Sequence, residues 1–276
     1  MQGFPPPPPP PPPPSRKEAS QTAKVLGSLG VVGVLLLKFF GKLKFVLLPL
    51  LKFFPMILKT GGTMLLSIWL YAMQWGVWFA VGFVLLIFVH ECGHLLAARR
   101  LGLKVGAPVF IPFMGAFIAL KEAPRDAWVE AQVGIGGPML GTLGAAVCEL
   151  IHLATGNPLF RALAYTGFFL NLFNLAPVGF LDGGRIVTAL SPWLWLVGFA
   201  VLVAMVVTQP NFLLVIILVL SLPRLFFLFR HKSAAEQRFF EVTPRQRWTV
   251  AGMYFGLVAL LVLGMEMSHI PQESLR

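Results

Sequence analysis

Charged residues are scarce in this sequence. Only 12% of its 276 residues are Asp, Glu, Lys or Arg, whereas 57% are hydrophobic and the mean hydropathy is +0.79. This composition excludes an ordinary water-soluble domain, because the apolar residues recur in runs from residue 25 to residue 265. We therefore expect an all-α polytopic membrane protein with about six transmembrane helices.

Acidic residues and cysteines are few as well. Against 22 Lys and Arg there are 11 Asp and Glu, an excess that would indicate a nucleic-acid partner in a soluble protein. Here the basic residues cluster at the ends of apolar runs, which indicates contact with the lipid bilayer and no nucleic acid. Cys92 and Cys148 lie inside apolar segments, which excludes an extracellular disulfide framework.

Composition divides the chain into five parts. Residues 1–24 form a predicted disordered tail whose ten prolines, 5–14, act as a spacer or, less favoured, bind a proline-binding partner. Residues 25–60 mix lysines with apolar runs, which is typical of a basic amphipathic segment in the headgroup region. The remaining parts are a central core, a basic cytoplasmic loop and a last transmembrane helix with its tail: 61–230, 231–248 and 249–276.

The six predicted spans follow from the apolar runs. They are 64–98, 127–153, 159–175, 186–207, 212–229 and 250–264. Basic residues gather in the loops after the first and fifth spans, so this side is predicted to face the cytoplasm, in a multi-pass protein of the cell membrane. One crossing by 64–98 would leave the lysines of 25–60 on the opposite side. An additional crossing upstream would remove this conflict.

The loop after the first span contains an apolar stretch that is too short to cross. Residues 107–120 are interrupted by Pro108, Pro112 and Gly115. Such a stretch predicts a short re-entrant or β-hairpin element beside the membrane.

The strongest chemical signal is the sequence His90-Glu91-Cys92-Gly93-His94. On a helix, four residues turn by about 400° and rise about 6 Å, so both imidazoles project from nearly the same face and can chelate one Zn²⁺ ion. Glu91 lies beside that face, where it can take a proton from a metal-bound water. Chance would produce this motif about once in a few hundred such sequences, and ionisable residues in a membrane helix are costly to bury.

A catalytic zinc ion usually has a third protein ligand. Asp182 is the best placed candidate, because Pro177 and Gly179 break the preceding helix and Gly183 and Gly184 allow a tight re-entry. Capping of the following helix is the alternative role for Asp182, but next to a motif that lacks a third ligand we favour ligation. The other candidates lie at the far end of a helix, in loops or in the tail: Asp126, His152, His231 and His269.

The motif HECGH, followed about eighty residues later by NLAPVGFLDGGR, resembles the site-2 protease family of intramembrane zinc metalloproteases. Gly136-Gly137-Pro138 resembles the small-residue motif of that family. The resemblance covers residues 64 to 230, so that 61–230 is expected to be the metalloprotease core. Phe180 departs from the family, in which proline often precedes the Leu-Asp-Gly triplet, and we expect this to affect the shape of the loop.

The resemblance implies a function and roles for particular residues. His90, His94 and Asp182 would be ligands of one Zn²⁺ ion, and Glu91 would be the base that activates water. Asn174 matches a family asparagine that holds substrate or the catalytic geometry. The implied activity is zinc-dependent hydrolysis of peptide bonds in membrane-anchored protein substrates near the cytoplasmic face, with the stretch 109–120 pairing with an unwound substrate segment by strand addition.

Two alternatives stay open at this stage. One is a membrane metalloprotease of the kind that processes prenylated proteins, which shares HExxH but has a glutamate as third ligand; Glu149 would be that ligand. The other is a catalytically silent membrane scaffold or metal transporter. Glu91 argues against the second alternative, because a site that only binds metal does not need this carboxylate.

Overall fold

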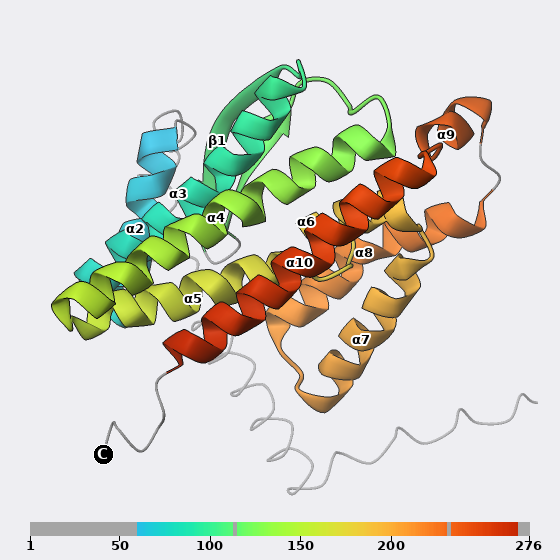
Figure 1. The fold of residues 1–276 in the computed structure, drawn as a ribbon. Helices are drawn as coiled ribbons and strands as arrows, with labels where there is room; N and C mark the ends of the chain where they lie inside the picture. The colour runs from blue at the N-terminus through green and yellow to red at the C-terminus, as the bar shows by residue number, and fades with distance from the viewer. Residues whose placement is uncertain (1–59, 113–114, 231–232, 270–276) are drawn as a thin grey trace, which may run out of the picture. The chain divides into compact units, whose positions relative to one another are not determined.

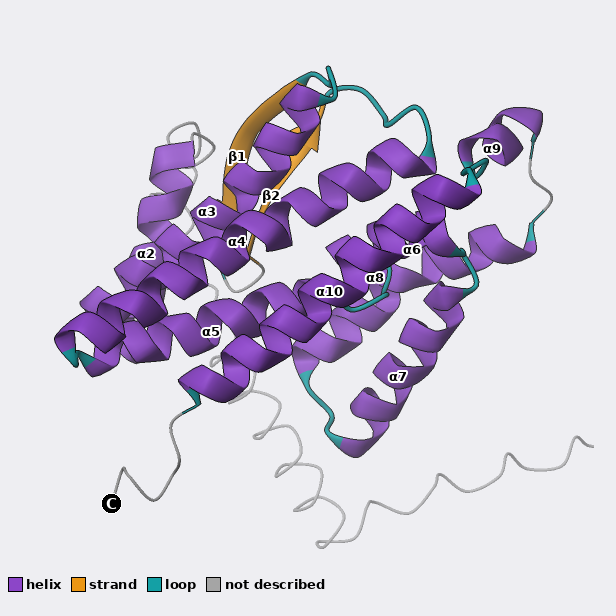
Figure 2. Ribbon diagram, viewed as in Figure 1, coloured by secondary structure: helices purple, strands orange, loops and turns teal. Residues whose placement is uncertain are grey.

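A computed structural model describes residues 60–112, 115–230 and 233–269. Within these residues the protein is mostly helical, with one two-stranded antiparallel sheet (Figure 1 and Figure 2). The predictions for the proline tail and for the lysines of 25–59 lie outside the described residues.

The elements follow one another with short connections. In chain order they are α2 (Thr60–Trp75), α3 (Val77–Arg100), β1 (Val105–Ile111), β2 (Gly115–Leu120), α4 (Ala127–Thr155), α5 (Pro158–Asn174), α6 (Asp182–Leu190), α7 (Leu194–Thr208), α8 (Phe212–Phe229), α9 (Ala234–Phe239) and α10 (Pro244–Ser268). The basic segment 231–248 therefore contains the short helix α9 and the first turn of α10.

The predicted span 64–98 is two helices, so the expectation of one long helix was wrong. Gly76 separates α2 from α3 with φ 81°, a conformation that a side chain with a Cβ rarely adopts. The chain reverses there, because the ring centroids of Tyr71 and Phe83 lie 5.2 Å apart instead of the ~18 Å of a straight helix. Helices α2 and α3 are therefore antiparallel, and α2 begins toward the side where α3 ends. This is the direction that an additional crossing before α3 would need in order to remove the conflict over the lysines.

Strands β1 and β2 form the predicted β-hairpin, with Phe110 opposite Ala116. The hairpin runs back along α3 instead of away from it (Figure 2), because the rings of Phe88 and Phe110 stack with centroids 6.3 Å apart. Helix α2 also packs against strand β1, and the backbone N–H of Phe110 donates to Thr63 Oγ1 at 3.2 Å.

The predicted span 186–207 is also two helices, and the single-span expectation was wrong here too. Helix α6 ends at Leu190, Ser191 is extended, and α7 begins two residues after Pro192. Proline lacks the N–H that a continuing helix needs and disfavours a helical residue before it. The short helix α6 is therefore a separate element, and it carries Asp182 at its first position.

Four of the described helices are long and apolar enough to cross a membrane: α3, α4, α8 and α10. Helices α5 and α7 are apolar but shorter, with 17 and 15 residues. Large apolar side chains are exposed on these helices, for example Val201 on α7 and Leu263 on α10, as expected for surfaces that face lipid. The findings support an integral membrane protein.

Helix α4 is the centre of the bundle and packs against α3, α5, α6 and α10. Half of its buried residues are glycine or alanine, which let neighbouring helices approach closely. Figure 1 shows α4 running beside α3, and this contact contains the candidate site.

Candidate metal centre

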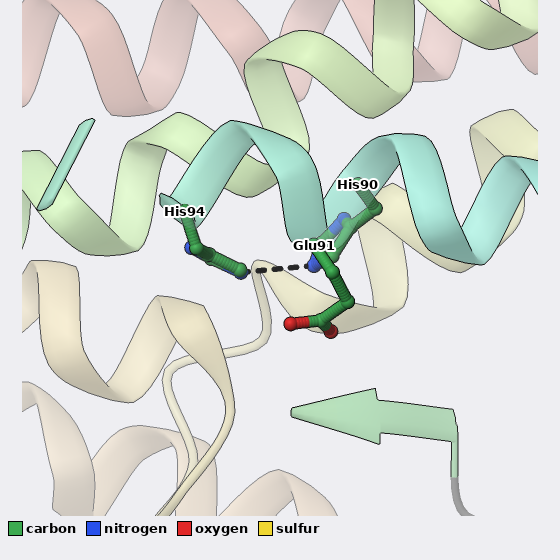
Figure 3. Close-up of side chains that lie close together, drawn as sticks. All are labelled: His90, Glu91 and His94. Carbon is green, nitrogen blue, oxygen red and sulfur yellow. Dashed lines mark hydrogen bonds between the residues drawn. The ribbon is translucent and has the colours of Figure 1, made fainter. Parts of the chain in front are cut away.

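Helix α3 presents His90 and His94 on one face, one turn apart, as their spacing predicts (Figure 3). Their Nε2 atoms lie 3.1 Å apart. Both imidazoles are buried, at 4% and 7% exposure, and together with Glu91 they form a group that could hold a metal ion. Helix α3 therefore places two candidate ligands side by side inside the bundle.

Asp182 reaches the same point from α6. Its Oδ2 atom lies 3.1 Å from His90 Nε2 and 3.2 Å from His94 Nε2. The carboxylate does not cap α6, because the N-cap of this helix is Leu181 and no side chain makes a capping hydrogen bond there. The side chain is thus aimed at the histidines. Glu149, the alternative third ligand, lies near the far end of α4.

The Nδ1 atom of each imidazole has a hydrogen-bond partner that fixes the tautomer. His94 Nδ1–H donates to the carbonyl of Val133 at 2.8 Å, and a carbonyl can only accept. His90 Nδ1–H donates to Asn171 Oδ1 at 2.8 Å, while the Asn171 amide nitrogen donates to the Gly167 carbonyl at 2.7 Å. In the neutral imidazoles, both Nε2 atoms are therefore free of hydrogen and available as ligands.

The donor set fits a zinc ion. Two imidazole Nε2 atoms and a carboxylate oxygen converge with separations of 3.1, 3.1 and 3.2 Å. Ligands at 2.0–2.1 Å from a tetrahedral zinc ion are roughly 3.3 Å apart, which is close to these separations. Three lone pairs this close repel one another in the neutral tautomers unless a cation lies between them. Three protein ligands also leave the fourth position for water or substrate.

Glycines allow α4 to approach the histidines. A Cβ at Gly137 would overlap the His94 imidazole, and one at Gly136 would lie 2.6 Å from the carbonyl oxygen of Gly93. The small-residue segment Gly136-Gly137-Pro138 therefore lets the α4 backbone lie against α3 beside His94.

Glu91 lies beside the two imidazoles with 5% exposure. Its carboxylate belongs to the lining of a cavity of about 700 Å³ that also contains His90, His94 and Asp182. The rest of the lining is mostly apolar and comes from α2, α3, the hairpin, α5 and α8. The Glu91 side chain and the candidate metal ligands therefore line the same, mostly apolar cavity.

The two asparagines of α5 have different positions. Asn174 lines the cavity, but its side-chain amide donates to the Leu170 carbonyl of its own helix at 3.0 Å. Asn171, one turn earlier, is 2% exposed and holds His90. Sequence reasoning missed Asn171. The sequence did show an amide among the apolar residues of a predicted membrane helix, which indicates a buried hydrogen bond. It did not show that the partner is His90.

Comparison with known proteins agrees with this geometry. Residues 78–156, which contain α3, the hairpin and α4, match the family described as Peptidase family M50. A similar protein is the zinc metalloprotease MJ0392 of Methanocaldococcus jannaschii, 30% identical over 130 residues, which are 45% of this chain and 37% of that protein. The probable zinc metalloprotease EGY2, chloroplastic, of Arabidopsis thaliana is 30% identical over 154 residues, or 40% of this chain and 27% of that protein.

The putative zinc metalloprotease Rip3 of Mycobacterium tuberculosis is 31% identical over 117 residues, 40% of this chain and 29% of that protein. The chain thus spans between about a quarter and two fifths of the length of these relatives. The matched residues carry both histidines and Glu91, and all three relatives are named zinc metalloproteases. The predicted resemblance is confirmed: residues 78–156 of this chain match Peptidase family M50, the site-2 protease family.

Proposed function

We propose that this protein is a zinc-dependent intramembrane endopeptidase that hydrolyses peptide bonds of membrane-anchored proteins near the cytoplasmic face. His90, His94 and Asp182 would hold one Zn²⁺ ion. The convergence of these three side chains, from two elements far apart in the chain, is the observation that carries the proposal. A purely metal-binding role would leave the buried Glu91 beside them without a use.

The chemistry of the site assigns a proton to Glu91. Zinc, when bound, supplies a Lewis acid that polarises the scissile carbonyl and makes a water molecule acidic. Glu91 accepts the proton of the attacking water and returns it to the nitrogen of the leaving amine. The apolar lining keeps other water away from the reacting atoms, and the partners of His90 and His94 keep both imidazoles in the ligand tautomer.

An extended peptide suits the cavity as substrate. Strand β2 contributes Gly115, Ala116 and Ile118 to the lining, next to Glu91. A substrate segment lying beside β2 could pair with its backbone and present a peptide bond to the site. Asn174 lines the same cavity, and we assign it a contact with such a segment.

Charge supports the predicted orientation and is consistent with six spans. Arg99 and Arg100 end α3, and Arg230 follows α8, while α5 and α7 connect the four longer helices. Six crossings by α3, α4, α5, α7, α8 and α10 put both basic ends on one side, which by the positive-inside tendency faces the cytoplasm.

The central experiment is the substitution Glu91→Gln in the full-length protein, purified in detergent. We expect this variant to retain about one zinc ion per chain and to lose cleavage of a membrane-anchored test substrate, by roughly 10²-fold or more, because an amide cannot accept the proton. Zinc content is measured by elemental analysis, and cleavage is measured by gel.

Glu122→Gln is the matched control, because Glu122 is half-exposed beyond the hairpin and pairs with Lys104. The control should cleave like the wild type. If Glu91→Gln still cut the substrate at the wild-type rate, the assignment of Glu91 as the base would be wrong.

A further inference from the structure

Asp182 needs support from outside its own helix. It lies at the start of α6, which has only nine residues and no side-chain cap at its N-terminus. Its Oδ2 atom must stay within ligand distance of two imidazoles on α3. A shift of α6 by about 1 Å would remove one of three zinc ligands, because ligand distances vary by only about 0.2 Å.

Arg224 of α8 makes a network that holds α6. Its Nη1 donates to the Gly184 carbonyl at 3.0 Å and to Thr188 Oγ1 at 3.3 Å, while Nη2 donates to Glu130 Oε1 at 3.0 Å. The guanidinium also lies over the Trp195 ring, 5.1 Å from its centroid. One side chain thus joins α4, α6, α7 and α8.

The Gly184 carbonyl is the point at which this network reaches Asp182, two residues away. It also accepts from Trp195 Nε1 at 2.8 Å. On its other side α6 is blocked, because a Cβ at Gly184 would lie 2.7 Å from the carbonyl oxygens of Val178 and Gly179. The first turn of α6 is therefore fixed between the backbone of the preceding loop and the Arg224 guanidinium.

The charge of Arg224 is balanced locally. Its partner Glu130 is on the first turn of α4, and its side chain is 12% exposed. Arg185 approaches the same carboxylate oxygen more weakly, at 3.8 Å. A charged hydrogen bond that is mostly shielded from water is stronger and better oriented than one in solvent.

We propose that Arg224, with Glu130, is a positioning residue that sets the place of Asp182 in the metal centre. The inference rests on the proposed zinc site and adds to it a requirement on α8, beyond the residues that match the family. Arg224 touches neither the ligand atoms nor the cavity that holds them; it acts through the Gly184 carbonyl.

The test compares Arg224→Gln, Arg224→Lys and Arg230→Gln in the full-length protein. Arg230 is the matched control, since it follows the same helix but has its ion pair with Glu236 and its ring contact with Phe227, 4.8 Å from the centroid, and neither partner belongs to α6. The rate of zinc loss to a chelator is the main readout, and the absorption spectrum of the Co²⁺-substituted protein reports the ligand geometry. Helical content and thermal unfolding of the metal-free protein show whether the fold is retained.

We expect Arg224→Gln to bind zinc 10–100-fold more weakly, as for loss of other supports of metal ligands, with correspondingly faster release and an altered Co²⁺ spectrum. Arg224→Lys should be intermediate, because an ammonium keeps the charge near Glu130 but cannot form the planar fork. Arg230→Gln should match the wild type. If Arg224→Gln does not fold, Arg224→Lys decides: release at the wild-type rate overturns the proposal.

Failure of this inference is distinguishable from failure of the zinc site. If the wild-type protein retains zinc and His90→Ala loses it, but folded Arg224 variants release zinc at the wild-type rate, the positioning role alone is wrong. If the wild-type protein holds no zinc after refilling with ZnCl₂, the proposed function is wrong and the positioning role falls with it.

Discussion

At the scale of single residues, the two proposed histidine ligands are oriented by different means. The Val133 carbonyl that accepts from His94 belongs to the helix backbone, so no side-chain substitution at that position removes it. His90 instead depends on a side chain, Asn171, whose amide is itself fixed by the Gly167 carbonyl. A side-chain substitution can therefore remove the hydrogen bond that orients His90, but not the one that orients His94.

This difference predicts opposite results for two asparagines one turn apart. Asn171→Ala should weaken zinc binding by about 10–100-fold, because the His90 imidazole loses the acceptor that fixes its tautomer and orientation. Asn174→Ala should keep zinc and lower cleavage, because Asn174 lines the cavity and bonds only to the Leu170 carbonyl in the hydrogen bonds that the described residues show. Zinc titration and substrate cleavage measured on both variants check the pair. Loss of zinc in Asn174→Ala with normal binding in Asn171→Ala would reverse the assignment.

Local sequence predicted part of this site. The spacing of His90 and His94 determines their common face on any helix, so the structure could hardly have placed them otherwise. The position of Asp182 required an argument by elimination, and the partnership of Asn171 with His90 crosses 81 residues of chain. Contacts of that separation depend on how helices pack, which the apolar pattern of each helix does not specify.

At the scale of elements, the contact between α3 and α4 determines how close the backbone comes to the ligands. Gly93 on α3 faces Gly136 on α4, and Gly137 faces the His94 ring. The close approach has no room for a methyl group at these positions. Helix packing here thus shapes the candidate metal centre as well as the fold.

We therefore expect Gly137→Ala to displace His94 and to weaken zinc binding by at least about tenfold, in line with the loss of a ligand's support. Gly256→Ala on α10 is the control, since nothing lies within 4 Å of a Cβ at that position. The control should retain zinc and change helix stability by less than about 1 kcal/mol. Zinc affinity and thermal unfolding are measured for both variants; equal affinities would show that the close approach is not required.

The limits of the sequence are clearest at the element breaks. An apolar pattern continues through Gly76 and through Ser191-Pro192, so both segments were predicted as single spans. Glycine is common within membrane helices, so the reversal at Gly76 becomes visible only in the structure, for example in the edge-to-face contact between Tyr71 and Phe83. Pro192 was a stronger signal, because a proline disfavours the helical conformation of the residue before it, and Ser191 is indeed extended.

At the scale of the whole described region, the contacts between helix ends define two faces. Arg224 near the end of α8 touches Glu130 at the start of α4, and Arg247 at the start of α10 donates to the Leu190 carbonyl at the end of α6 at 2.7 Å. On the opposite face, Arg161 at the start of α5 donates to the carbonyl of His269, after α10, at 3.0 Å. Among the described residues, Arg161 is the one Lys or Arg near this second face.

This asymmetry predicts which positions a membrane-impermeant thiol reagent reaches. In a chain with Cys92 and Cys148 replaced by alanine, we expect single cysteines at Lys104 and Arg245 to react only in inverted vesicles, and cysteines at Thr155 and Gln209 only in intact cells. The basic face should be cytoplasmic, because translocating clustered positive charge is unfavourable. Gln209 lies between α7 and α8, so its labelling together with Thr155 is the decisive result for α7, which at 15 residues spans about 22 Å. Labelling of Gln209 from the Lys104 side would show that α7 and α8 do not cross, and the six-span arrangement would be wrong.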